Sequence, residues 1–183
     1  DALGSNYVQR RVEVVGPAVS AELRRTGILA VTIAVLAIMA YVWFRFEWQF
    51  AVGTLLSLLH DVMAVIGIFS LFQLEFDLGI VAALLTILGY SVNDTIVIFD
   101  RVRENTRNRS ARGLPLAAIV NNAVNQTLSR TVITAGATLL SVIALYLFGG
   151  EVLEGFAFTM LVGIISGTYS TVFIAASIAI MLQ

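Results

Sequence analysis

Five long apolar runs constrain this chain more than any other feature of its sequence. Each is close to the roughly 20 residues that a helix needs to cross a bilayer. Three runs carry no charged residue, the second is interrupted only by His60 and Asp61, and the third only by Asp94. A chain with only 13% charged residues cannot cover a water-facing surface and needs lipid as its solvent. The predicted spanning helices are about 27–44, 50–72, 78–99, 131–149 and 156–182.

Residue types that are missing from the chain exclude several chemistries. There is no cysteine and only one histidine, which excludes disulfides, thiolate sites and multi-histidine metal sites. All 11 basic residues are arginine, and without lysine there is neither a Walker A loop nor a Schiff-base amine. The net charge of −1 and the absence of a broad basic face give no case for nucleic acid as a partner. We therefore expect no metal and no cofactor.

The polar stretch at residues 1–25 predicts the end of a separate domain. Tyr7–Val15 is rich in β-branched residues and partly alternating, which predicts a strand that the following Gly-Pro pair ends. Residues 18–25 are good helix formers that lead into the first span. Because the chain starts with Asp1 and no signal pattern follows, we interpret it as the C-terminal part of a longer protein. The predicted fold is an all-α, five-helix membrane bundle at 26–183, preceded by the tail of an extracytoplasmic α+β domain.

The distribution of arginine predicts how the bundle is oriented. The long connection at 100–130 carries six arginines, whereas the short turns at 73–77 and 150–155 carry four acids and no arginine. The positive-inside rule then places the long connection in the cytoplasm, the acidic turns and the N-terminal segment outside, and the C-terminus in the cytoplasm. Arg24 and Arg25 flank the first span on its outer side, against the rule. A translocated domain can override such local charge.

The cytoplasmic connection predicts two helical segments. Residues 100–112 continue the third helix as a charged extension, which Gly113 ends. Pro115 falls in the first turn of a new helix. Residues 116–128 are amphipathic, with asparagine and glutamine on one side. This segment either lies along the inner membrane face or is a connector packed on the bundle.

The charged groups inside the spans are candidates for function. A charge in the bilayer costs about 2.5–3.5 kcal/mol on insertion scales, so such groups are rarely incidental. At a rise of about 1.5 Å per residue, Asp94 lies roughly 8–9 Å and Asp61 roughly 16 Å from the inner surface. Arg130 stands at the inner mouth of the fourth span, within side-chain reach of that depth. Burial favours the neutral form of an acid and a nearby cation favours its charged form. A helix shift that makes or breaks an Asp94–Arg130 contact would therefore load or release a proton.

A structural interpretation of the same residues stays open. Intramembrane polar groups often only hold helices together through hydrogen bonds. Arg130 is also explained as a positive-inside anchor. His60 and Asp61, as neighbours about 100° apart on a helix, do not share one face, so one of them can serve structure alone.

Small and polar residues recur at helical spacing on the last three runs. Ala82 and Thr86 continue into a stripe that ends beside Asp94, and the fifth run contains a GxxxG pattern. Such stripes are expected to face protein or a wet cavity rather than lipid. The predicted polar face consists of Tyr90, Asn93, Thr95 and Thr131, and the predicted packing glycines are Gly89, Gly163 and Gly167.

The segment Gly89–Asn105, GYSVNDTIVIFDRVREN, closely resembles the signature of SecF-type proteins in the SecD/SecF protein-export family. Four further blocks agree with it: Val15–Leu23, His60-Asp61, Thr127–Thr131 and Gly163–Ser170. The resemblance implies a membrane module of the RND superfamily in the bacterial inner membrane. The full form of such a protein adds an N-terminal span and a periplasmic domain.

The resemblance also implies a function and partners. SecD and SecF together are understood to use the proton gradient to assist late translocation of preproteins that emerge from SecYEG. Protons are then the coupling ion, and the subunit has no catalytic chemistry of its own. The family's intramembrane aspartate and arginine map onto Asp94 and Arg130, with Asp61 and His60 as further proton-relay candidates.

Two other classes of protein are alternatives to this function. Intramembrane aspartyl proteases also place two aspartates on adjacent spans, but they carry GxGD on one helix. This chain instead has Asn93-Asp94, with Gly89 five residues before the aspartate. The remaining alternative is a passive scaffold subunit in which all intramembrane charges are structural.

Overall fold

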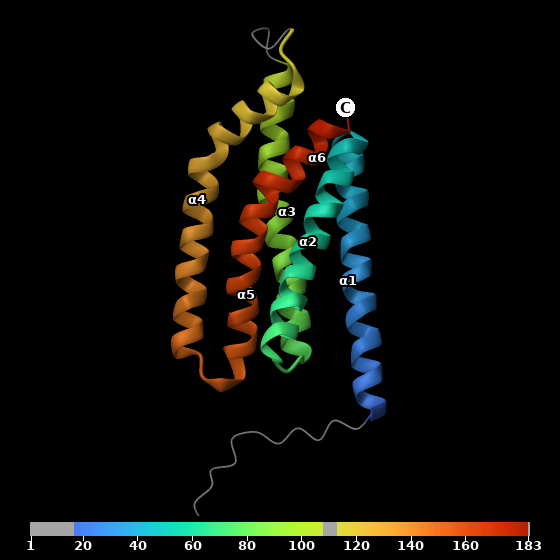
Figure 1. Ribbon diagram of the computed structural model, residues 1–183, viewed down its shortest axis with the longest axis vertical. Helices are drawn as coiled ribbons and strands as arrows, with labels where there is room; N and C mark the ends of the chain where they lie inside the picture. Colours follow the sequence, from blue (N-terminus) through green and yellow to red (C-terminus); the bar gives the residue numbers. More distant parts are fainter. Residues whose placement is uncertain (1–16, 108–112, 183) are drawn as a thin grey trace, which may run out of the picture.

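The computed structural model describes residues 17–107 and 113–182. This part of the chain is helical apart from short turns, and five of its helical segments are long and apolar enough to cross a membrane (Figure 1). The predicted all-α bundle with five spans is therefore confirmed. The strand predicted at Tyr7–Val15 lies outside the described residues.

The helix bounds agree with the predicted spans and extend several of them. The first helix begins at Pro17, so residues 18–25 do lead directly into the first span. Gln73, which has the left-handed φ of 53°, ends the second helix. The elements are α1 (Pro17–Arg45), α2 (Trp48–Phe72), α3 (Leu78–Arg107), α4 (Leu116–Phe148), α5 (Glu151–Ser170), the π-helix η2 (Thr171–Ala175) and α6 (Ala176–Met181).

The amphipathic segment at 116–128 is the first part of α4 rather than a separate helix. No glycine or proline lies between Leu116 and Ala135 to break the helix, so it runs on into the fourth span. Its apolar side, with Val120 and Ala123, packs against Phe99 of α3. The structure thus supports the packed connector of the two alternatives.

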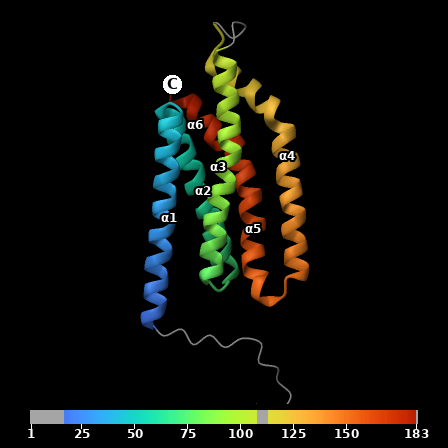
Figure 2. The same ribbon diagram turned by 180° about the vertical axis from the view of Figure 1, so that it is seen from behind.

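The middle of the bundle is formed by α2, α3 and α5, with α1 and α4 on opposite sides (Figures 1 and 2). Side chains of α2, α3, α4 and α5 share one buried apolar cluster that includes Val65, Leu84 and Ile164. Many large apolar side chains face outward, among them Phe44 at 94% and Phe148 at 86% exposure. Such an outer surface suits lipid rather than water as solvent.

The π-helix η2 changes the direction of the last span. The ribbon of α5 bends at this segment and continues as α6 toward the start of α2 (Figure 1). On the facing side, a Cβ added to Gly53 would lie 2.6 Å from the carbonyl oxygen of Ala175. Only glycine at this position lets the backbones of α2 and η2 approach so closely. Isolated π-turns are often found at functional sites.

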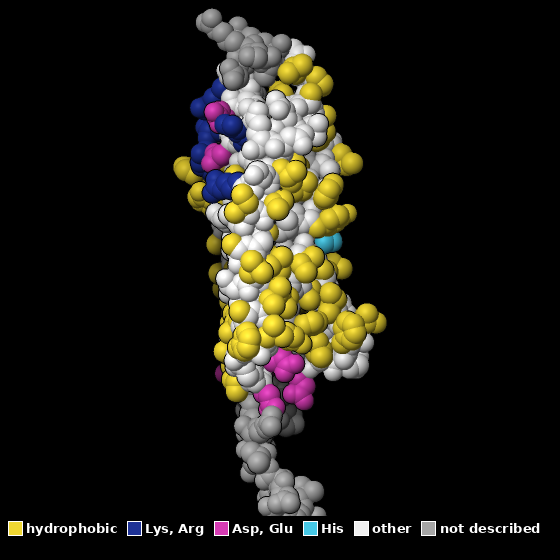
Figure 3. Space-filling view, turned by 90° about the vertical axis from the view of Figure 1, so that its left-hand side faces the viewer, with side chains coloured by type: hydrophobic (Ala, Val, Ile, Leu, Met, Phe, Trp, Pro, Cys, Tyr) yellow, Lys and Arg dark blue, Asp and Glu magenta, His cyan; other side chains and the backbone are white. Residues whose placement is uncertain are grey.

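Charged side chains separate to the two ends of the bundle. In the view of Figure 3, arginines gather at one end together with a few acids, the other end carries acids, and an apolar band lies between them. At the first of these ends, Arg45 of α1 donates to Asp100 of α3 over 2.7 Å. We call it the arginine-rich end (Arg45, Arg101, Arg103, Arg107 and Arg130) and the other the acidic end (Glu75, Asp77, Glu151 and Glu154).

Candidate functional site

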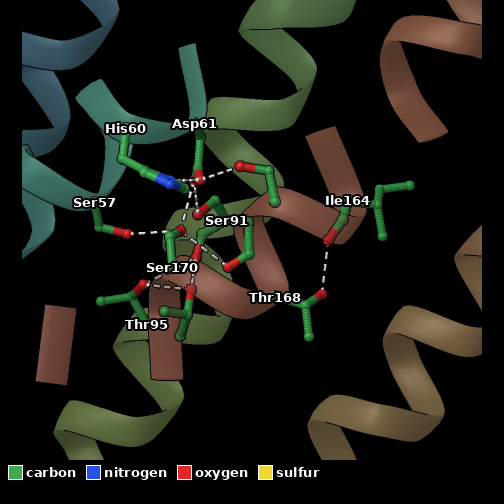
Figure 4. Close-up of polar contacts among 11 residues, drawn as sticks. Ser57, His60, Asp61, Ser91, Thr95, Ile164, Thr168 and Ser170 are labelled. Atoms are coloured by element: carbon green, nitrogen blue, oxygen red, sulfur yellow. Dashed lines mark hydrogen bonds and ion pairs between the residues drawn. The ribbon is translucent and has the colours of Figure 1, made fainter. Parts of the chain in front are cut away.

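Asp61 on α2 is fully buried and faces α3 and α5 (Figure 4). Its Oδ2 accepts hydrogen bonds from Ser91 Oγ at 2.8 Å and Ser170 Oγ at 2.9 Å, and its Oδ1 accepts one from Ser166 Oγ at 2.9 Å. Both carboxyl oxygens are therefore satisfied. This is the condition under which such a group can lie inside an apolar bundle.

Further hydroxyl groups extend this arrangement into a network. Ser57 donates to Ser170 Oγ over 2.9 Å. The hydroxyls of Thr95 and Thr171 lie 3.0 Å apart, and Thr95 also donates to the carbonyl oxygen of Ser91 over 3.1 Å. Residues of α2, α3, α5 and η2 thus meet through side-chain hydrogen bonds. Thr95, predicted as part of the polar face beside Asp94, belongs to this Asp61 network.

His60 forms the outer edge of the Asp61 site. Its Nδ1 lies 3.2 Å from Asp61 Oδ1, so the imidazole turns toward the carboxyl group although neighbouring helix positions are about 100° apart. The imidazole is 39% exposed, and its ring lies 6.2 Å from that of Tyr169, between centroids. In Figure 3 the histidine stands on the outer surface among apolar side chains. An imidazole at this distance from a carboxyl group can pass a proton to it.

Asp94 lies at a different junction, between α3 and α4. Its carboxyl group is half-buried, and its Oδ1 accepts a hydrogen bond from Thr131 Oγ1 at 2.9 Å. Thr131 itself is buried, so α4 holds this donor in place. Tyr90 packs against the apolar core, and Asn93 is exposed. Asp94 is therefore held less firmly than Asp61.

The expected contact between Asp94 and Arg130 is not formed as an ion pair. Arg130 is exposed, and within residues 17–107 and 113–182 no ion pair joins it to Asp94. Arg130 directly precedes Thr131 on α4. Thr131 is the direct partner of Asp94. Neighbouring residues on a helix point about 100° apart, so when Thr131 faces Asp94 the preceding Arg130 points elsewhere.

Two of the three predicted packing glycines make close contacts. A Cβ at Gly163 would collide with the side chain of Ile87, and one at Gly167 would lie 3.2 Å from Ser91 Cβ. These contacts bring α5 against α3 and so place Ser166 and Ser170 beside Asp61. Gly89 is different, since a Cβ there would meet no atom within 4 Å. Its predicted packing role is therefore not seen within the described part of this chain.

Sequence reasoning missed the serine donors of Asp61. Ser91 stands three residues before Asp94, and Ser166 lies within the GxxxG pattern of the fifth run. The close approach of Gly53 to the π-helix was also missed. The sequence did contain a signal for these donors, because serines stand among the small residues of the same runs, at the helical spacing of the glycines.

The polar stripe predicted on the third run forms an exposed face. It lies on α3, and Figure 2 shows α3 with α1 on one side and α4 on the other. The prediction placed these residues against protein or a wet cavity, but within residues 17–107 and 113–182 no other helix covers them. The exposed positions are Ala82, Thr86, Gly89 and Asn93.

Comparison with known proteins gives a consistent answer. The model of the family "Protein export membrane protein SecD/SecF, C-terminal" matches residues 1–183. The chain is 52% identical to protein translocase subunit SecF of Cereibacter sphaeroides over 171 residues, which cover 93% of this chain and 52% of that protein. It is 49% identical to SecF of Escherichia coli O157:H7 over 182 residues, or 100% of this chain and 56% of that one.

Fused relatives and solved structures are also similar. Protein translocase subunit SecDF of Brucella abortus is 51% identical over 175 residues, 96% of this chain and 23% of that protein. The crystal structure of SecDF, a translocon-associated membrane protein from Thermus thermophilus, superimposes with a TM-score of 0.85 at 48% identity. The aligned region covers 91% of this chain and 23% of the SecDF chain. The chain thus spans about half the length of the SecF relatives and about a quarter of the SecDF relatives.

Proposed function

Because the chain belongs to the SecD/SecF C-terminal family of protein export membrane proteins, we propose that it is the membrane-embedded part of a SecF-type subunit of the Sec translocase. The subunit assists late export of preproteins from SecYEG across the bacterial inner membrane, together with SecD. It carries out no catalytic chemistry of its own. Identities near 50% over almost the whole chain and the SecDF-like bundle support this function.

Coupling to the proton gradient rests on one observation, the environment of Asp94. Its half-buried carboxyl group has a single side-chain donor, Thr131, while Arg130, the residue before Thr131 on α4, is exposed and does not pair with it. Rotation of α4 that replaces the Thr131 hydroxyl with the Arg130 guanidinium would favour the charged carboxylate and release a proton. The reverse rotation would favour uptake. Proton exchange and movement of α4 against α3 are then one process.

Asp61 and His60 form a second proton position in this proposal. Ser91, which donates to Asp61, precedes Asp94 by three residues, so one turn of α3 carries a group of each site. The alternative is that the Asp61 network only holds the helices together. The complete hydrogen bonding of the Asp61 carboxyl group favours this structural role for Asp61, but not for His60 or Asp94.

We propose that SecD covers the exposed stripe of α3. Small side chains at Ala82 and Gly89 allow another helix to approach closely, and Thr86 and Asn93 offer polar partners. The similarity to SecDF, in which both parts belong to one chain, supports this partner. In the membrane, the arginine-rich end and the C-terminus face the cytoplasm, and the acidic end and N-terminal segment face outward.

The decisive experiment replaces Asp94 with asparagine in the full-length subunit together with SecD. The amide keeps the size and polarity of the carboxyl group but cannot ionise. Proton flux and gradient-driven export are measured in membrane vesicles, with Glu104→Gln as a control that removes the same charge from an exposed position on α3. We expect Asp94→Asn to lose both activities and Glu104→Gln to keep them. Full activity of Asp94→Asn would favour the passive scaffold.

A further inference from the structure

A cavity of about 490 Å³ lies at the arginine-rich end, beside the turn between α1 and α2. The last turns of α3 form another wall, and Leu116 of α4 and Ala179 of α6 complete the lining. Neither Asp61 nor Asp94 lines it, so the cavity is separate from the site described above. Its polar and charged lining residues are Arg45, Glu47, Gln49, Arg103, Thr106 and Arg107.

Arginine dominates the charge of this cavity. Three arginines line it against one acid, Glu47. Arg103 and Arg107 stand four residues apart on α3 and therefore lie on one face of the helix. Both are exposed, and neither pairs with an acid within the described residues, where Arg45 pairs with Asp100. Two guanidinium groups are thus available to an anion.

One of the residues that line this cavity, Gln49, has an amide oxygen without a partner. The Oε1 atom of Gln49 is buried and has no hydrogen-bond partner. A buried polar atom without a partner destabilises a fold, so such atoms usually meet a ligand or water. Gln49 also lies in the first turn of α2, where the side chain of Glu47 makes no capping hydrogen bond. Free N–H groups at a helix start favour a bound anion.

Aromatic side chains place this cavity at the level of the lipid headgroups. Trp43, Phe44 and Trp48 surround the same turn and are 64%, 94% and 51% exposed. Tryptophan is enriched where a bilayer meets water. Inside the cavity, the rings of Phe46 and Phe50 lie 6.2 Å apart between centroids and form an apolar wall.

We propose that this cavity binds an anionic phospholipid whose headgroup carries free hydroxyls, of the phosphatidylglycerol kind. The phosphate lies between Arg103 and Arg107, because guanidinium groups match phosphate oxygens in geometry and charge. Once the Gln49 side chain turns toward the cavity, a headgroup hydroxyl donates to its Oε1, and an acyl chain runs along Phe46 and Phe50. Basic pockets between spanning helices bind acidic headgroups in this way. Inorganic phosphate shares the anion chemistry but has no acyl chain.

The test measures lipid binding to the full-length subunit by native mass spectrometry, with phosphatidylglycerol and phosphatidylcholine titrated separately. We expect preferential binding of phosphatidylglycerol. Arg103→Gln should weaken it about fivefold, the usual effect of one arginine near anionic lipid. Arg101→Gln is the matched control, since it removes the same charge two residues away on α3, where Arg101 pairs with Glu104 and does not line the cavity.

A second comparison isolates the headgroup hydroxyl. Phosphatidylmethanol has the charge of phosphatidylglycerol without its hydroxyls and should bind more weakly to the unmodified protein. Gln49→Leu should remove this difference while leaving phosphatidylcholine binding unchanged. Equal losses for Arg103→Gln and Arg101→Gln would reduce the effect to general surface charge and overturn the site. Displacement of phosphatidylglycerol by millimolar inorganic phosphate would show that a free anion, rather than a lipid, is the ligand.

Discussion

Removing the hydroxyl of Ser170 should weaken the bundle measurably, because two side-chain hydrogen bonds to α2 meet at its oxygen. Ser170 Oγ donates to Asp61 Oδ2 and accepts from Ser57 Oγ, both over 2.9 Å, and all three residues are buried. Ser170→Ala leaves the hydroxyl of Ser57 without this acceptor and removes one of the three serine donors of Asp61.

The expected size of the effect follows from what each group loses. An unsatisfied buried polar group costs about 1–3 kcal/mol. Measured hydrogen bonds between membrane helices average only about 0.6 kcal/mol and reach about 1.7, because the unfolded chain finds other partners in the membrane. For two connected bonds we therefore expect a loss of about 1–2 kcal/mol in the free energy of unfolding.

The matched control is Ser141→Ala. Ser141 is exposed, and its hydroxyl donates to the carbonyl oxygen of Ala137 on its own helix over 3.0 Å. Its removal should change stability by less than about 0.5 kcal/mol. The measurement is reversible unfolding of the purified protein in mixed micelles with increasing SDS. If both variants lost the same free energy, the Asp61 network would not hold the helices together, and the reasoning above would be refuted.

Three further outcomes are expected. With single cysteines at Arg107 and Glu151, an impermeant thiol reagent on intact cells should label position 151 and spare position 107; the reverse labelling would overturn the proposed orientation. Gly163→Ala should destabilise the bundle by about 1–3 kcal/mol in the same SDS titration, because the added Cβ overpacks the α3–α5 contact, whereas Gly89→Ala should be neutral in this chain. Arg130→Ala should lower proton-driven export. In the Asp94→Asn background it should cause little further loss, because groups that act as one unit are non-additive. Additive losses in a double-mutant cycle would leave Arg130 as a topology anchor only.

Much of the local structure could be predicted from the sequence. The charged extension of α3 to Arg107 and the lead-in helix before the first span were both expected, and both are seen. The joining of residues 116–128 to the fourth span was not expected. The Gly113–Pro115 segment breaks the chain before this helix, but no second glycine or proline separates residues 116–128 from the span.

The sequence by itself determined the five spans and the position of each charge along its span, because length, hydropathy and helical rise are properties of one segment. Tertiary structure alone decided which carboxyl group is enclosed. In the sequence, Asp61 and Asp94 are both single acids in apolar runs. In the structure, Asp61 accepts hydrogen bonds from three serines, whereas Asp94 accepts one from a single threonine. The difference arises because Gly163 lets α5 approach α3 closely, which carries its serines to Asp61. How far a helix turns and how near it comes depend on its neighbours, and no single segment contains that information.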